Sequence, residues 1–298
     1  FPYNLPELRE NNGNYGLIAA TPFGNTLTLE FAYAAIEGEK LGMGKETDFL
    51  AVSFSSPDYI GHRFGPTSKE LEDNYLRLDL EIEQFLNYLD KTYGKGNYLV
   101  FLSADHGVAD IATYMESERV PAGNLNFGYI LGQARGYMTV KYGEGNWILN
   151  GSNDQIFLNH ELIQEKELEL DDIQEQLANF LLRYNGIKEV YTASAMRSTA
   201  FTQHRPHLLQ MGYNHKASGD LLIILEPSWL PGGARGTSHG TGFTYDTHVP
   251  IVFFGWGVKS GESTRYATVT DIAPTLSMLL NIRLPNGATG QPIHELFD

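Results

Sequence analysis

Asn97-Tyr98-Leu99-Val100-Phe101-Leu102-Ser103-Ala104-Asp105-His106-Gly107 is an apolar run that ends in a carboxylate and an imidazole. A second such run, Asp48-Phe49-Leu50-Ala51-Val52-Ser53-Phe54-Ser55, leads directly into Ser56-Pro57-Asp58-Tyr59-Ile60-Gly61-His62. Both runs are short and rich in Val, Phe and Leu, which predicts two buried strands. Ligands and metals bind just beyond the carboxyl ends of such strands in open α/β sheets. The pattern therefore predicts an α/β sheet with four possible metal ligands at one edge, namely Asp58, His62, Asp105 and His106.

A long helix is predicted between these two strands. Thr67-Ser68-Lys69-Glu70 has the form of a capping box, apolar residues follow at helical spacing from Leu71 to Leu89, and Gly94 and Gly96 close the segment. Strand, helix and strand form a βαβ unit, in which the two strands are parallel and the crossover is right-handed. We therefore expect both ligand-bearing loops at the same edge of the sheet.

The rest of the chain surrounds this unit. The pattern predicts a helix over 26–41, capped by Asn25 or Thr26 and ended by Gly42. From 110 to 218 the pattern changes to that of an inserted accessory α+β subdomain. Its predicted elements are strands at Tyr137–Tyr142 and Ile156–Leu158 and an amphipathic helix over 161–184. The main sheet is expected to resume at Asp220–Leu225 and Pro250–Phe254, followed by a helix with Asp271 near its cap.

The composition excludes several classes of function. The 298 residues can bury a sizeable core, but the formal net charge of −15 argues against a nucleic-acid partner, which requires clustered Lys and Arg. Because the chain contains no Cys, any metal must be held by His, Asp or Glu. No stretch has the length and apolar character of a transmembrane helix, so membrane insertion is not expected. The oligomeric state is left open.

A metal site with these four ligands needs a further one from downstream. His239, in Arg235-Gly236-Thr237-Ser238-His239-Gly240, lies among small residues that can approach a metal closely. His248 precedes the predicted strand at its amino end, the wrong edge for a parallel strand, so we favour His239 and interpret His248 as a residue that fixes the start of the strand or an outer partner. The remaining histidines have no carboxylate at useful spacing and are expected on the surface: His160, His204, His207, His215 and His294.

Three motifs in this order resemble the alkaline phosphatase superfamily: Ser-Pro-Asp-Tyr-Ile-Gly-His-Arg-Phe-Gly-Pro from Ser56, Ser-Ala-Asp-His-Gly from Ser103, and Gly-Thr-Ser-His-Gly from Gly236. The chain most resembles bacterial single-domain alkaline phosphatases related to the nucleotide pyrophosphatase/phosphodiesterases. The likeness extends from Thr21-Pro22-Phe23-Gly24-Asn25 to Thr289-Gly290-Gln291-Pro292-Ile293. It implies a mainly parallel sheet sandwiched by helices, with 1–298 as the C-terminal portion of a single domain that contains the insertion.

The resemblance implies a site of two zinc ions. Asp58, His62 and His239 would hold one ion, and Asp105 and His106 would supply half of the ligands of the other. In the family, an aspartate and a threonine or serine nucleophile from an amino-terminal portion complete the second ion's site. This sequence shows no such segment, so we expect a fragment that carries most of the metal site, contains no nucleophile and is inactive by itself.

The expected function of the parent is zinc-dependent hydrolysis of small-molecule phosphate monoesters in the periplasm or outside the cell. Two metals about 4 Å apart can stabilise both the attacking and the leaving oxygens of a displacement at phosphorus. Phosphodiesterase or nucleotide pyrophosphatase activity is the alternative among enzymes. A metal-binding module without catalysis is the alternative from another class.

Overall fold

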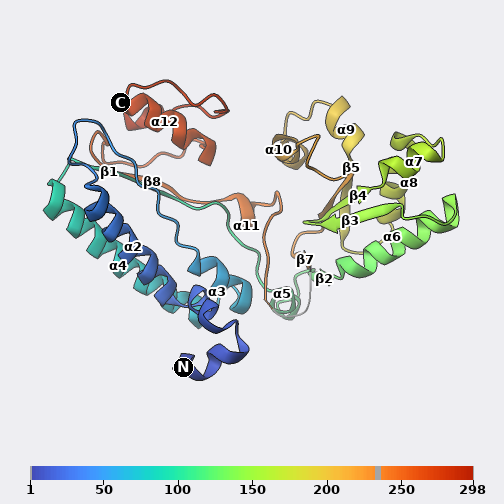
Figure 1. Cartoon of the computed structure of the whole chain (residues 1–298), viewed down its shortest axis with the longest axis horizontal. Helices are drawn as coiled ribbons and strands as arrows, with labels where there is room; N and C mark the ends of the chain where they lie inside the picture. The colour runs from blue at the N-terminus through green and yellow to red at the C-terminus, as the bar shows by residue number, and fades with distance from the viewer. Residues whose placement is uncertain (1, 232–235, 298) are drawn as a thin grey trace. The chain divides into compact units, whose positions relative to one another are not determined.

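The computed structural model describes residues 2–231 and 236–297, and these separate into two compact units (Figure 1). Unit 1 contains the residues up to Ile60, Ser68–Gly107 and the residues from His248 onward. Unit 2 contains Gly61–Thr67 and Val108–Thr247. Arg235, in the His239 motif, lies outside the described residues. The predicted insertion over 110–218 stays a prediction.

Unit 1 combines helices with a two-stranded sheet. Its elements are α1 (Leu5–Leu8), η1 (Arg9–Asn11), η2 (Asn14–Ala20), α2 (Pro22–Glu39), α4 (Lys69–Tyr93), β1 (Leu99–Ser103), β8 (Ile251–Gly255), η3 (Val269–Asp271), α12 (Ile272–Leu279) and η4 (His294–Leu296). Helix α3 (Ser56–Phe64) begins in unit 1 and ends in unit 2. Helices α2 and α4 pack against each other.

The predicted end of α4 at Gly94 is confirmed, but its N-cap is Ser68 and not Thr67, the capping position in the expected Thr67–Glu70 box. The Ser68 hydroxyl accepts a hydrogen bond from the Leu71 N–H at 3.2 Å, and Gly94 follows the helix with a φ of 86°. Helix α2, however, begins at Pro22 rather than at residue 26, because Thr21 is extended and Pro22 suits the first helical position. Asn25, one of the two expected caps, is instead buried within the helix and donates to Asn74 Oδ1 of α4 at 2.9 Å.

The predicted parallel pair of strands is wrong. Strand β1 pairs antiparallel with β8, in register from Leu99 with Gly255 to Ser103 with Ile251. Residues 48–55 form no strand, since hydrogen bonds to a neighbouring strand define one and no such partner lies among the described residues. Across the described chain, the pairing of β2 with β7 is parallel and the others are antiparallel. Apolar periodicity indicates strand character but cannot supply the partner.

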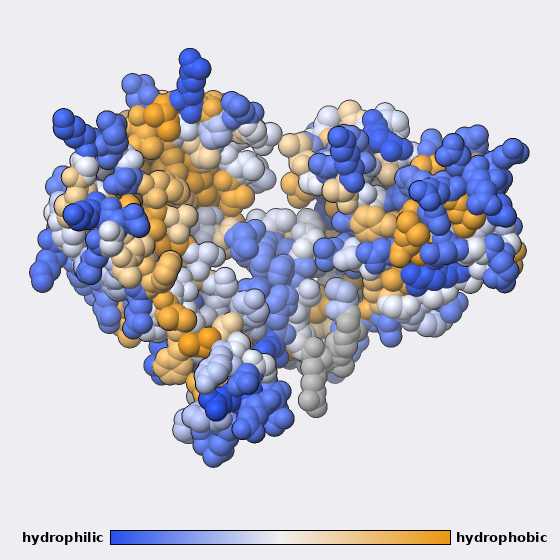
Figure 2. Space-filling model, viewed as in Figure 1, coloured by the Kyte–Doolittle hydropathy of each residue, from blue (hydrophilic) through white to orange (hydrophobic). Residues whose placement is uncertain are grey.

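One face of the β1–β8 sheet is apolar and exposed. Leu102 lies opposite Val252, and both are about half exposed, as is Phe254 on the same face. Figure 2 shows apolar surface over the part of unit 1 that contains these strands. The clusters of buried hydrophobic residues found in residues 2–231 and 236–297 all belong to unit 2.

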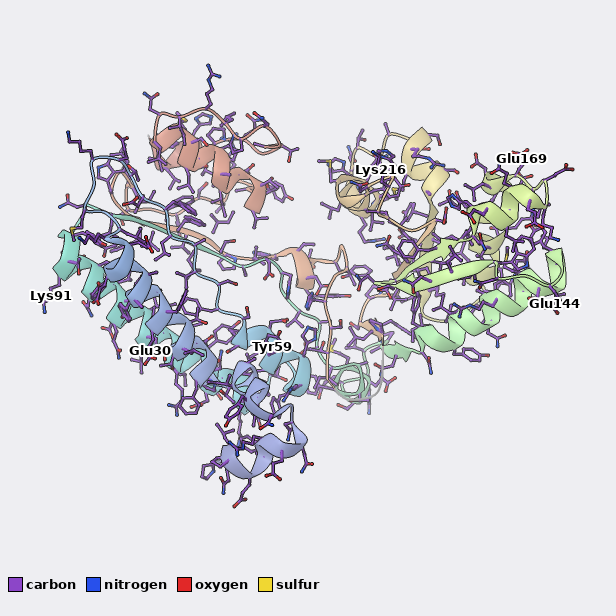
Figure 3. The ribbon with its side chains drawn as sticks, in the orientation of Figure 1. Glu30, Tyr59, Lys91, Glu144, Glu169 and Lys216 are labelled. Atoms are coloured by element: carbon purple, nitrogen blue, oxygen red, sulfur yellow. The ribbon has the colours of Figure 1, made fainter. Side chains whose placement is uncertain are left out.

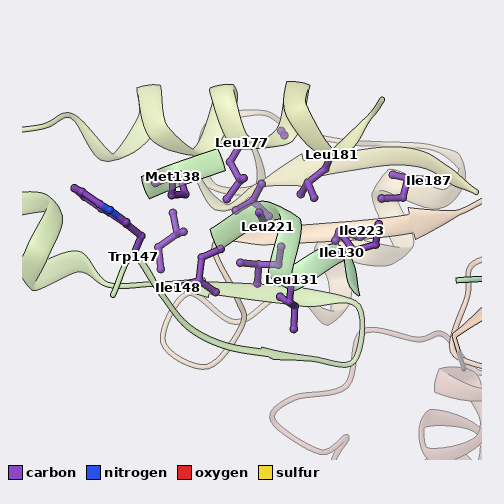
Figure 4. Close-up of a cluster of buried hydrophobic side chains, with 14 of the residues drawn as sticks. Ile130, Leu131, Met138, Trp147, Ile148, Leu177, Leu181, Ile187, Leu221 and Ile223 are labelled. Carbon is purple, nitrogen blue, oxygen red and sulfur yellow. The ribbon is translucent and has the colours of Figure 1, made fainter. Parts of the chain in front are cut away.

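Unit 2 is built on a four-stranded antiparallel sheet in the order β3-β4-β6-β5. Its elements are α5 (Ala112–Ser117), β2 (Gly123–Leu125), α6 (Phe127–Tyr142), β3 (Ile148–Ser152), β4 (Gln155–Leu158), α7 (His160–Glu165), α8 (Leu170–Leu181), β5 (Ile187–Thr192), α9 (Ala193–Ser198), α10 (His204–Gly212), β6 (Leu221–Leu225), β7 (Trp229–Pro231) and α11 (Thr244–Thr247). Strand β6 is buried along its whole length, and Leu221 and Ile223 pack in the same core as Met138 and Leu177 (Figure 4).

Two predicted elements of this unit differ from the observed ones. Tyr137–Tyr142 was expected as a strand but forms the last turns of α6, where the buried residues Ala134 and Met138 follow a helical spacing. The single helix expected over 161–184 is two helices, because the chain leaves the helical conformation at Glu167, whose φ is 53°. Strand β4 includes the predicted strand Ile156–Leu158.

The turn between β3 and β4 carries a partly buried carboxyl with a perturbed pKa. Asn153 and Asp154 both have positive φ, 50° and 56°, as a two-residue hairpin turn requires. Burial raises the pKa of Asp154 from 3.8 to about 6. The ionised carboxylate is thus disfavoured in the fold, and stability is lost as the pH rises from about 4 through 6.

We expect Asp154→Asn to stabilise unit 2 at high pH. Asparagine tolerates the left-handed backbone of this turn and cannot ionise. The pKa rise to about 6 corresponds to a gain of roughly 1–3 kcal/mol in the free energy of unfolding at pH 8, and to little gain at pH 4. Urea unfolding at both pH values measures this difference. An equal effect of the substitution at pH 4 and pH 8 would contradict the role of ionisation.

Candidate metal centre

Helix α3 carries Asp58 and His62 on consecutive turns. Both were expected in a loop after a strand, but Ser56–Phe64 is helical, with Pro57 in the first turn, where its fixed φ suits a helix. Residues four apart on a helix share one face, with Cβ atoms about 5–6 Å apart. The helix thus replaces the loop as the element that brings this carboxylate and imidazole together. Tyr59, which follows Asp58 on α3, is labelled in Figure 3 and locates this helix.

Three predicted ligands lie together in unit 1. Nε2 of His106 is 4.0 Å from Asp58 Oδ1 and 3.6 Å from Asp105 Oδ2. The Nδ1–H of His106 donates to the Gly107 carbonyl at 2.8 Å, so Nε2 carries the lone pair that faces these carboxylates. Asp105 is the most exposed of the three, with 90% of its side chain accessible. Imidazole nitrogens and carboxylate oxygens such as these are both known zinc ligands.

The other two predicted ligands meet in unit 2. Nε2 of His62 lies 3.1 Å from Nε2 of His239. The Nδ1 of His62 lies 2.8 Å from the Thr237 carbonyl oxygen, which can only accept a hydrogen bond. His62 therefore carries its proton on Nδ1 and presents the lone pair of Nε2 toward His239. Two imidazole ligands of one tetrahedral zinc ion are roughly 3.3 Å apart, given Zn–N bonds of about 2.0–2.1 Å. The pair therefore fits a shared metal ion.

A glycine allows the His239 segment to lie against α3. Gly236 has a φ of 80°, and a Cβ at this residue would lie 2.3 Å from the carbonyl oxygen of His62. The N–H of Thr237 donates to that same carbonyl at 3.2 Å, and its hydroxyl donates to the Ala109 carbonyl. Thr237 is a residue that the sequence reasoning missed as a partner of His62, since 175 positions separate the two. Its place beside His239 in the motif was the one available signal.

His248 is exposed and lies three residues before β8. The contact of His239 with His62 supports His239 as the further ligand, and the choice between the two stays a prediction. His160 is exposed, as expected, but it has a carboxylate partner distant in sequence, since its Nε2 is 2.8 Å from Asp220 Oδ1. Sixty positions separate these two residues, so local spacing could not reveal the pair.

The comparisons with known proteins agree with this fold. The family model of type I phosphodiesterase / nucleotide pyrophosphatase matches residues 14–249. The chain is 43% identical over its whole length to a protein of Myroides odoratus named calcium-transporting ATPase, and spans 55% of it. It is 41% identical, over 99% of its length, to alkaline phosphatase PafA of Elizabethkingia meningoseptica and spans 54% of that protein. A crystal structure of PafA matches with a TM-score of 0.92 at 41% identity, over 100% of this chain and 57% of that one.

The chain belongs to the type I phosphodiesterase / nucleotide pyrophosphatase family, within the alkaline phosphatase superfamily. The predicted resemblance and the alkaline-phosphatase-like α/β fold class are thereby confirmed. The chain spans about half the length of the curated relatives that it matches. Within the described residues, no helix combines the length and the apolar character that crossing a membrane requires.

Proposed function

We propose that the protein to which this chain belongs hydrolyses small phosphate esters with the help of two zinc ions. The observation that carries the proposal is the convergence of His62 and His239, at 3.1 Å between their Nε2 atoms, next to the carboxylate one helical turn away on α3. Family membership supports the reaction class, since a curated relative is named an alkaline phosphatase.

The chain's own residues have distinct roles in this proposal. Asp58, His62 and His239 hold one ion, and Asp105 and His106 supply two ligands of the other. The carbonyls of Thr237 and Gly107 fix the tautomers of His62 and His106, so that each Nε2 is available for metal binding. When bound, two metal ions stabilise the attacking and the leaving oxygen of a displacement at phosphorus.

Phosphate monoesters are the proposed substrates, because the relatives at about 41% identity include a named alkaline phosphatase. The family description favours diesters or pyrophosphates as the alternative. An extra cationic group near the phosphorus would favour the monoester dianion, whereas an apolar pocket would favour a diester. The net charge of −15 supports a substrate other than nucleic acid. A periplasmic or extracellular location is proposed from the family alone.

We expect this chain alone to bind zinc but to hydrolyse phosphate esters very poorly. One proposed ion has three ligands in the chain, which is enough for a site with an open position, while the other has two and should be bound weakly. No hydroxyl in the sequence has an evident reason to act as a nucleophile, so a covalent route is not available. Zinc titration should therefore give one tight equivalent and one weak equivalent.

The test assays the chain and its longer parent side by side. An activated phosphate monoester, the corresponding diester and ATP are supplied as substrates, with zinc present in each assay. The parent should turn over the monoester fastest, and the chain should be slower by orders of magnitude. Comparable turnover of the monoester by chain and parent would mean that a nucleophile is present here. A chain that binds no zinc would contradict the metal site itself.

A further inference from the structure

The position of His239 depends on how its segment is held at both ends. The segment has no regular secondary structure, and on its amino side Thr237 is bonded to His62 and Ala109. On its carboxyl side, Gly240 has a φ of 109°, a conformation that other residues rarely adopt. Because glycine can adopt many conformations, the backbone at Gly240 alone does not fix the position of Thr241, and side-chain contacts are needed to hold it.

Asp246 provides that second attachment. It is 3% exposed, and its Oδ2 accepts hydrogen bonds from the Thr241 N–H at 2.8 Å and from the Thr241 hydroxyl at 2.6 Å. Thr241 is two residues beyond His239. The N–H of Asp246 donates to the Phe243 carbonyl at 3.0 Å, so the carboxylate is itself held by a short helical turn, α11.

Arg205 holds this turn in place. Its guanidinium carbon lies 4.8 Å from the centre of the Phe243 ring, and its Nη2 donates to Glu189 on β5. Tyr245 lies beside this turn: burial raises the pKa of its phenol most, and hydrogen bonds with Thr241 and the Ser228 backbone partly offset this rise.

We propose that Asp246 is a positioning residue for His239. It ties the residue two beyond the imidazole to a fixed helical turn and does not touch the metal. Metal ligands must be held within a few tenths of an ångström of their bonding geometry, so a loose segment lowers affinity. This inference rests on the proposed function, since it assigns a part of the support for the same metal site.

The affinity test compares variants at this residue. Asp246→Ala should lower the zinc affinity of the chain by up to about 10-fold, the low end of the cost of removing an outer partner, because Asp246 acts on His239 through Thr241. Asp246→Asn keeps an acceptor oxygen for Thr241 and should stay close to the wild-type affinity. Gln174→Ala serves as the matched control, because Gln174 is fully buried in unit 2 and hydrogen-bonded to Asp220. It should lower stability without changing zinc affinity in the folded protein.

A second measurement separates this inference from the zinc proposal. In the metal-free protein, NMR should detect a nuclear Overhauser effect between the rings of His62 and His239, whose centroids are 4.9 Å apart. Asp246→Ala should lose this signal, and Gln174→Ala should keep it. If the wild type binds no zinc but Asp246→Ala loses the signal, positioning stands and the zinc proposal fails. If Asp246→Ala keeps both signal and affinity, or Gln174→Ala loses as much affinity, positioning is overturned.

A milder variant covers the case in which Asp246→Ala does not fold. Thr241→Val removes the hydroxyl donor and keeps the backbone N–H, so it should lower zinc affinity by less than Asp246→Ala. Adding Asp246→Asn to Thr241→Val should lower the affinity little further, because Asp246→Asn keeps an acceptor for the Thr241 N–H. Wild-type affinity in Thr241→Val together with an intact ring–ring signal would count against the proposal.

Discussion

Replacing His239 with alanine should lower the zinc affinity of the chain by more than about 100-fold, beyond the usual cost of losing an outer partner. The substitution removes one of three proposed ligands of the better-formed ion and leaves Asp58 and His62 on α3. Two ligands do not complete a catalytic type of zinc site, which takes three from the protein. Competition with a chromophoric chelator measures the change directly.

His248→Ala is the matched control for this prediction. It removes an imidazole from the same stretch of sequence, and His248 is exposed and lies three residues before β8. Its zinc affinity should stay near that of the wild type. A larger loss for His248→Ala than for His239→Ala would show that the wrong histidine was chosen as the further ligand. Equally small losses of zinc affinity in His239→Ala and His248→Ala would mean that neither histidine is a ligand.

The candidate site residues could be proposed from the sequence because they follow recognisable local patterns. Asp58 and Asp105 lie near His106 in unit 1, although Asp58 lies on a helix and not in a loop, and their role as metal ligands stays a prediction. A helix brings residues four apart to one face, so Asp58 and His62 stay close together although the predicted loop is a helix. The partners that fix the imidazoles were not predictable, since backbone carbonyls such as that of Thr237 leave no mark on residue type.

The fold was predictable where local chemistry decides it and less so where partners decide it. Gly94 ends α4 as expected, and the helix starts within one residue of the expected cap, because capping depends on residues within one turn. The strand expected over 48–55 failed for the opposite reason, since pairing depends on a distant segment. Asn25 shows the same limit, because its side chain bonds to Asn74 of another helix and not to its own backbone.

The pairing of Asp220 with His160 belongs to a larger buried network in unit 2. Asp220 is 8% exposed, and its carboxylate accepts from the Leu158 N–H at 2.8 Å and from Gln174 Nε2 at 2.9 Å. Gln174 is fully buried and also accepts from the N–H and hydroxyl of Ser194. One carboxylate thus connects β4, α7 and α8.

We expect Asp220→Ala to destabilise unit 2 by about 3–5 kcal/mol, because it leaves buried donors of Leu158 and Gln174 without an acceptor, at a cost of about 1–3 kcal/mol each. His160→Ala should cost less than about 1 kcal/mol, since 58% of that side chain is exposed and the carboxylate keeps its other partners. Urea unfolding at pH 7, followed by circular dichroism, gives both values. Hydrogen exchange adds a local readout, since the Leu158 amide should lose protection in Asp220→Ala and keep it in His160→Ala. Equal destabilisation by the two substitutions would mean that the ion pair, and not the buried network, carries the stability.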